Sequence, residues 1–398
     1  MNLACVFFLF ATVSAIPTGR VEIVFPSVET SRSGVKTLKF RALGEEVELK
    51  LEPAGDILAK DFAFYNGNHE KQHSVDVESL RRRLYKDRTN GAALLIDDDE
   101  QPPLIEGIVF SKLSISPQIS EDGKRAHRVE ELTSDREFYL SDNIILPDFQ
   151  REMDNFSRID RDDKCIVIEV LSLTESNFTE RFETEQALTE YVTLMYSAAE
   201  TLLRQLDSGI QLRLSGIQAF TKETEPPFFK SNDIEDGKYY DAEILTGMKN
   251  YFCKNPITLS KNADIIMLLI TRYMMSLNPD GTPDGFAAGF AYSGTVCYRC
   301  HKVGVTRDYR NVVSGSSLLA HEISHLLGVP HDGESPQYTG VFGSPGAESC
   351  PSSDGFLMGY NTGVNSEKFS QCSKDCAKYL LSKRRASCVY EKCKNSRY

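Results

Sequence analysis

The residues with the clearest chemical pattern lie between His321 and Asp332, where three histidines and a glutamate occur at fixed intervals. If residues 314–327 are helical, His321 and His325 project from one face of the helix, about 6 Å apart along its axis. Two imidazoles placed in this way can share one metal ion. Glu322 directly follows the first histidine and therefore belongs to the same turn of the helix.

Gly328 is predicted to end this helix, because a residue without Cβ readily adopts the left-handed conformation that turns the chain back. The turn lets His331 reach the same ion as a third ligand. Three neutral imidazoles leave a tetrahedral zinc with one position for water, whose pKa falls to about 7. Glu322 is placed to take the proton as general base, so the pattern predicts hydrolysis of a polarised carbonyl.

The complete pattern HExxHxxGxxHD resembles the metzincin metalloproteases, and Asp332 after the third histidine is similar to the adamalysin/reprolysin branch. That branch has a methionine turn beneath the metal, and Met358, 27 residues after His331, fits this position. The resemblance implies a zinc endopeptidase with Glu322 as its catalytic residue. It also implies that Asp332 orients the turn that carries His331. Calcium often accompanies such domains, but its ligands cannot be placed in this sequence.

The short layout, without a disintegrin-like tail, most resembles the salivary metalloproteases of ticks. This likeness implies host matrix or clotting proteins as substrates, such as fibrinogen, fibronectin and gelatin. Two other functions remain open: a catalytically silent binding protein on a protease scaffold, and a processing protease that acts on the organism's own proteins. A structural zinc site would need a fourth protein ligand. The intact Glu322 therefore favours the enzyme.

Residues 1–15 predict a secretory signal peptide, because an apolar run ends in Val13-Ser14-Ala15, small residues typical of a cleavage site. No later stretch of about 18 or more apolar residues occurs, so we expect a secreted, extracellular protein without a membrane anchor. The net charge of −12 and the pI near 5.2 argue against nucleic acid or anionic membrane as partners. The expected partners are protein substrates, and the sequence indicates no oligomeric state.

The distribution of cysteines predicts two domains after the signal, since every mature cysteine lies from Cys165 onward. Residues 16–161 resemble a β-rich reprolysin-type prodomain, whose antiparallel strands would cover the active site. Residues 162–398 predict a metzincin catalytic domain of the α/β class, with a twisted mixed sheet, packed helices and a small C-terminal subdomain. The expected strands are 21–25, 36–40, 47–51, 92–96, 107–113, 165–173, 210–214, 263–270, 289–292 and 303–306, and the expected helices are 188–206, 242–252, 314–327 and 375–383.

Several local features refine this outline. One of Ser314, Ser316 and Ser317 is expected to cap the zinc helix, and the Gly- and Pro-rich loop 333–355 to lack regular structure. Segments 289–292 and 303–306 are expected either to form the cleft rim, where a substrate backbone could pair, or to be ordinary interior strands. The basic run 81–83 is interpreted as a solvated face.

Arg158-Ile159-Asp160-Arg161 is a minimal processing site at the domain junction. Many relatives keep the enzyme latent with a prodomain cysteine that binds the zinc, but this prodomain has no cysteine. The blocking ligand would instead be His69, His73, His127 or a carboxylate of the run 97–100, or the domain would only obstruct the cleft.

The disulfide pattern cannot be derived from spacing. Family likeness implies the pairs Cys297–Cys388 and Cys350–Cys372. Five cysteines stay unassigned, and one of them is left over or serves in latency; these are Cys165, Cys253, Cys300, Cys376 and Cys393. Cys165 lies nearest the junction, although a structural bridge is the favoured role there. Asn155 and Asn177 begin glycosylation sequons, which agree with secretion.

Overall fold

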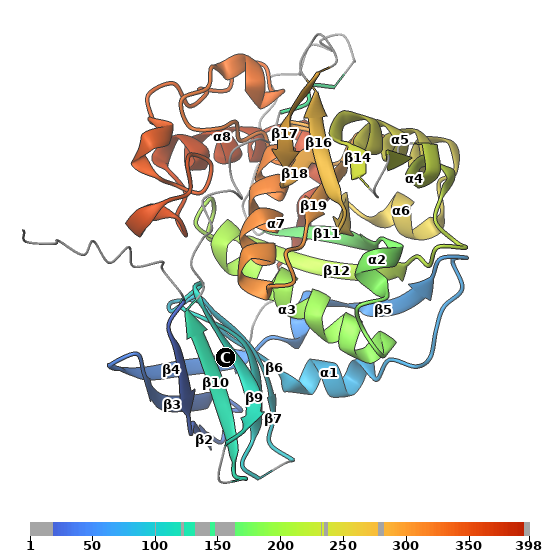
Figure 1. Ribbon diagram of the computed structural model, residues 1–398. Coiled ribbons are helices and arrows are strands. Elements are labelled where there is room, and N and C mark those ends of the chain that lie inside the picture. The colour runs from blue at the N-terminus through green and yellow to red at the C-terminus, as the bar shows by residue number, and fades with distance from the viewer. Residues whose placement is uncertain are drawn as a thin grey trace, which may run out of the picture.

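A computed structural model of the protein describes residues 19–99, 101–120, 123–131, 144–147, 164–231, 233–234, 238–277 and 282–393. The expected signal peptide, the processing site at residues 158–161 and the sequon at Asn155 lie outside these ranges. Among the described helices, none is long and apolar enough to cross a membrane. The α/β class and the β-rich N-terminal region are confirmed (Figure 1).

The N-terminal region forms a nine-stranded antiparallel sheet in the order β1-β10-β9-β8-β7-β6-β4-β3-β2. Its strands are β1 (Val21–Val24), β2 (Ser27–Thr30), β3 (Lys36–Ala42), β4 (Glu45–Pro53), β6 (Leu84–Asp87), β7 (Ala92–Asp97), β8 (Leu104–Val109), β9 (Leu113–Ile119) and β10 (Arg125–Glu131). The prediction of one strand over 107–113 is wrong. Phe110 and Ser111 have φ of +55°, so the chain turns between β8 and β9.

The second region is built on a sheet in the order β18-β19-β15-β11-β12-β5, in which the neighbours are parallel except for β18 with β19. β20 pairs antiparallel with β11. Helices α3 and α7 share the apolar core on one face, and α5 packs on the other. The bounds are β5 (Leu58–Asn66), β11 (Lys164–Thr174), β12 (Ile210–Ala219), β15 (Ile265–Ile270), β18 (Gly289–Ala291), β19 (Val303–Arg307), β20 (Tyr390–Lys392), α2 (Ser176–Thr179), α3 (Glu185–Leu203), α4 (Pro227–Ser231), α5 (Asp241–Lys254), α6 (Thr258–Asn262) and α7 (Val312–Leu326).

β5 comes from the first half of the chain but is the far edge strand of the second sheet (Figure 1). It runs parallel to β12, with Leu58 opposite Leu214 and Asn66 opposite Ala219. Because β5 lies between residues 16 and 161, the expected prodomain supplies part of the sheet that carries the expected catalytic domain.

Helix α1 (Val77–Arg83) follows β5 and lies close to α3. Arg81 Nη1 donates hydrogen bonds to the carbonyls of Gly55 and Leu58, 2.9 and 2.8 Å away. Arg83 forms an ion pair with Glu190 of α3. The interpretation of residues 81–83 as a solvated face is therefore wrong, since two of these guanidinium groups hold α1 against its neighbours.

A separate four-stranded sheet has the order β13-β14-β16-β17, with β13 (Asp233–Ile234), β14 (Lys238–Tyr240), β16 (Tyr273–Leu277) and β17 (Pro283–Ala287). The C-terminal residues gather around α8 (Gln371–Leu381), orange to red in Figure 1. Loop 333–355 was expected to lack regular structure, and this is only partly correct. It contains two single turns of 3₁₀-helix, Pro336–Thr339 and Ser352–Asp354.

The structure contains four disulfides, Cys165–Cys393, Cys253–Cys300, Cys297–Cys388 and Cys350–Cys372. The last two are the pairs implied by the family likeness. The remaining described cysteine, Cys376, is buried with a free thiol. Cys165 therefore ties β11 to the C-terminal segment and is not the free residue at the junction.

Candidate metal centre

Helix α7 presents the central histidines, and its two ends differ in how well they were predicted. Asn311 caps the first turn, because its side-chain oxygen accepts hydrogen bonds from the N–H groups of Val313 and Ser314. The serine caps were wrong, since the helix begins two residues earlier than expected. At the other end Gly328 has φ of +76°, and its N–H donates to the carbonyl of His325.

The three histidines converge at the end of α7. One ring nitrogen from each of His321, His325 and His331 lies within 4.8 Å of the corresponding nitrogens of the other two. The Nε2 atoms of His321 and His325 are 3.1 Å apart. Two nitrogens bound to one tetrahedral zinc would be separated by about 3.3 Å. His321 and His325 on the helix and His331 beyond the turn thus bring their side chains together, close enough to bind one metal ion.

The other ring nitrogens are arranged as metal ligands require. Nδ1 of His321 lies 2.9 Å from the carbonyl oxygen of Leu357, and Nδ1 of His325 lies 2.8 Å from that of Val329. A carbonyl can only accept, so each Nδ1 carries the proton and each Nε2 keeps its lone pair for an ion. A set of neutral imidazoles suits zinc, so these residues fit the ion implied by the sequence.

Glu322 lies beside the cluster and is only 1% exposed. It packs against Gly289 at the start of β18, where a Cβ would come within 2.1 Å of the Glu322 carboxylate. Among the described strands, β18 is the last of its sheet, and an edge strand can pair with another extended backbone. The carboxylate therefore lies between the three histidines and an edge strand.

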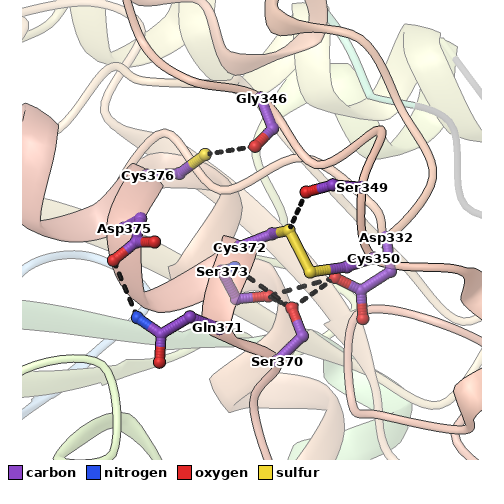
Figure 2. The surroundings of a disulfide bond; sticks show 10 residues. All are labelled: Asp332, Gly346, Ser349, Cys350, Ser370, Gln371, Cys372, Ser373, Asp375 and Cys376. Atoms are coloured by element: carbon purple, nitrogen blue, oxygen red, sulfur yellow. Dashed lines mark hydrogen bonds between the residues drawn. A yellow bond between two sulfur atoms is a disulfide. The ribbon is translucent and has the colours of Figure 1, made fainter.

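Asp332 and Met358 join the turn of His331 to the C-terminal subdomain, and Figure 2 shows Asp332 beside Ser370 and Ser373 of that subdomain. The Asp332 carboxylate accepts hydrogen bonds from Ser370, 2.5 Å away, and Ser373, 3.5 Å away. Burial raises the pKa of this carboxyl, and the hydroxyl donors oppose that rise. The Asp332 N–H donates to the carbonyl of Met358, whose side chain is fully buried. The segment below the histidines is thus fixed by its own backbone as well as by the methionine.

Sequence reasoning did not identify the roles of Leu357 or Ser370. Leu357 acts through its carbonyl, which any residue could supply, so its side chain gives no signal. Ser370 belongs to a segment that resembles the family, but nothing in its type pointed to Asp332.

The glycosylation candidate Asn177 lies in α2 and is half-buried.

The candidate latency residues lie elsewhere in the described structure. His127 is buried in the N-terminal sheet, where its Nε2 accepts a hydrogen bond from the N–H of Ile105 and burial lowers its pKa. Nδ1 of His69 lies 2.7 Å from the side-chain nitrogen of Gln218. His73 is exposed. Among residues 19–99 and 123–131, no histidine or carboxylate joins the three histidines.

Another short segment does reach this edge strand. Ile145 forms an isolated parallel bridge with Tyr292, and its carbonyl accepts a hydrogen bond from the N–H of Ser293 at 3.0 Å. Tyr292 directly follows β18. Residues 144–147, near the end of the expected prodomain, therefore lie beside the end of β18, the strand that borders Glu322.

Comparison with known proteins places these features in context. The reprolysin-type profile of metallo-peptidase family M12 matches residues 165–370. A metalloproteinase of Tityus obscurus is 61% identical over 370 residues, which cover 92% of this chain and 98% of that protein. The venom metalloproteinase antarease TserMP_A of Tityus serrulatus is 48% identical over 97% of both chains. The venom metalloproteinase BumaMPs1 of Olivierus martensii is 38% identical over 98% of this chain and 97% of its own length.

Proposed function

The chain belongs to the reprolysin group of metallo-peptidase family M12 and is a metalloendopeptidase, and from this premise we propose that it is a secreted, zinc-dependent enzyme that cuts extracellular proteins. The zinc ligands are His321, His325 and His331, and the general base is Glu322. The observation that carries the proposal is the convergence of three imidazoles beside a buried carboxylate and an edge strand.

When bound, a zinc ion supplies Lewis acidity, which polarises the carbonyl of the bond to be cut and makes a water molecule more acidic. Glu322 takes the proton from the attacking water and returns it to the nitrogen of the leaving amine. An extended substrate pairs its backbone with β18, which positions the carbonyl above the three imidazoles. The Met358 side chain forms an apolar floor below them.

Secretion and the choice of substrate are further parts of the proposal. Four disulfides are typical of an oxidising compartment, and two of the relatives are named venom metalloproteinases. We propose that the enzyme acts on host matrix or clotting proteins, with fibrinogen, fibronectin and gelatin as candidates. A salivary role and an endogenous processing role remain predictions, which expression in venom gland, salivary gland or other tissues would separate.

The chain is proposed to be made as a zymogen, with residues 16–161 as prodomain and 162–398 as catalytic domain. The bridge between Ile145 and Tyr292 favours obstruction of the cleft over a blocking ligand from the prodomain. Cleavage after Arg161 would cut the covalent link between this segment and the catalytic domain, so that the segment around Ile145 can leave the end of β18 even if the rest of residues 16–161 stays bound.

The test compares the full chain with the variant Glu322→Ala, each treated with a protease that cuts after Arg158-Ile159-Asp160-Arg161. We expect the wild type to cut gelatin and fibrinogen, a chelator to abolish the cleavage, and added zinc to restore it. Loss of the general base is expected to lower the rate about 10²–10⁴-fold while zinc content stays at one ion per molecule. A folded, zinc-loaded wild type that cuts neither protein nor a broad peptide library would contradict the proposal.

A further inference from the structure

The three histidines differ in what supports them. His321 and His325 lie on α7, are 5% and 1% exposed, and direct Nδ1 at neutral backbone carbonyls. His331 lies in a turn beyond the helix, and its side chain is 19% exposed. Its Nδ1 faces a carboxylate, since Oε1 of Glu334 is 3.3 Å away. The most exposed of the three histidines therefore has the charged partner.

Glu334 is held in place by its own backbone. Its N–H donates to the carbonyl of His331 at 3.0 Å, and its carbonyl accepts from the N–H of Ala347 at 2.8 Å. The neighbouring Gly333 N–H donates to the carbonyl of Ala347 at 3.0 Å, so two segments of the loop are joined by backbone hydrogen bonds at this point. The second carboxylate oxygen, Oε2, accepts from the N–H of His331 at 2.8 Å. Both oxygens of Glu334 thus engage one residue, His331.

Asp332 has a separate task. Its carboxylate points to Ser370 and Ser373 (Figure 2). Its N–H donates a hydrogen bond to the carbonyl of Met358. These contacts fix where the turn lies relative to the C-terminal subdomain. The carboxylate of Glu334 lies against the His331 ring itself, with Oε1 3.3 Å from Nδ1.

We propose that Glu334 is a positioning residue that orients and polarises His331 through Nδ1 and so strengthens the third zinc ligand. This inference rests on the proposed zinc site. A carbonyl partner fixes the tautomer of an imidazole, but a carboxylate also raises the electron density on Nε2. Loss of such a partner typically weakens metal affinity about 10–100-fold.

The experiment measures zinc affinity of the full chain by competition with a chromophoric chelator, and the absorption spectrum of the cobalt-substituted protein. Glu334→Ala is expected to bind zinc about 10–100-fold more weakly than the wild type and to change the cobalt spectrum. Glu334→Gln keeps an oxygen that accepts from Nδ1–H and from the backbone N–H but removes the charge. We expect its affinity to lie between those of the wild type and the alanine variant.

Two further variants make the outcome decisive. Glu348→Ala removes an exposed acidic side chain from the same loop and is expected to leave zinc affinity unchanged. His331→Ala removes the ligand itself. If His331→Ala loses zinc but Glu334→Ala does not, the role of Glu334 is refuted and the zinc site stands.

If His331→Ala binds zinc as tightly as the wild type, the zinc site itself fails. If Glu334→Ala weakens zinc only in proportion to a lower melting temperature of the zinc-free protein, Glu334 merely supports the loop and the inference is overturned.

Discussion

At the scale of single residues, Gly289 decides whether Glu322 can keep its position. A methyl group at residue 289 would lie 2.1 Å from Oε1, 2.5 Å from Cδ and 2.7 Å from Cγ of Glu322. Because these contacts involve most of the side chain, the carboxylate would have to leave its place. We expect Gly289→Ala to lower the rate of peptide cleavage at least about 10²-fold, as loss of the base would.

The measurement for Gly289→Ala is peptide cleavage beside zinc content and melting temperature. The control is Gly209→Ala, where the nearest atom to a new Cβ is the Asp207 carboxylate at 3.2 Å. Neither glycine has a positive φ, so backbone strain affects neither variant. Full activity of Gly289→Ala would show that the carboxylate does not act from the position in this structure.

At the scale of elements, the N-terminal sheet and α3 are joined by a buried ion pair. Lys86 of β6 and Glu200 of α3 are 2.8 Å apart, and their side chains are 2% and 3% exposed. Glu200 also accepts a hydrogen bond from the N–H of Leu212 in β12 at 3.1 Å. One glutamate therefore connects three elements: β6, α3 and β12.

We expect Lys86→Met to lower the free energy of unfolding of the full chain by about 3–5 kcal/mol, because it removes the lysine that pairs with the buried Glu200 charge. Adding Glu200→Gln should recover most of the loss, since the amide oxygen still accepts from the Leu212 N–H. Denaturant unfolding measures both variants.

The control for Lys86→Met is Lys39→Met. Lys39 pairs with Glu48 at 3.6 Å, but both side chains are about half exposed. Its loss should cost about 1 kcal/mol or less. Equal effects at the two lysines would argue against a special role for the buried pair.

At the scale of the whole molecule, the two expected domains share one core. Phe62 and Phe64 of β5 and Leu80 of α1 are buried in the same apolar cluster as residues of α3 and β12. Ala93 and Ile108 of the N-terminal sheet form a smaller cluster with Ala198 and Val313. Val313 lies about 12–18 Å along α7 from His321 and His325. The described strands of the N-terminal sheet thus pack near the start of α7, at the end of the helix away from the three histidines.

We therefore expect residues 16–161 to stay bound after cleavage at Arg161, because separation would expose this shared core and the edge of β12. Size-exclusion chromatography of the cleaved protein should give one peak that contains both fragments, and a denaturing gel verifies the cut. Separation of the fragments in native buffer, with no fall in the melting temperature of the larger one, would contradict the expectation.

Much of the candidate site follows from short stretches of sequence. The four-residue spacing of His321 and His325 sets their common face once a helix forms, and Gly328 permits the turn that returns His331. The four expected helices and most of the expected strands lie close to their predicted positions, because apolar periodicity reports local conformation directly. Many other elements, such as α4, β13 and β20, were not predicted. The likeness around Met358 placed the floor of the site by analogy with the family.

Only the tertiary structure decided what these pieces contact. β5 was not among the expected strands, because its apolar residues do not alternate with polar ones, and nothing local indicates that it joins β12 of the other sheet. The pairing of Lys86 with Glu200 joins residues 114 positions apart. The Leu357 carbonyl at His321 and the Glu334 carboxylate at His331 depend on how a long loop closes. Periodicity and residue type determine which helices and strands form. Which strands pair and which side chains meet depends on long-range packing, about which local sequence carries no information.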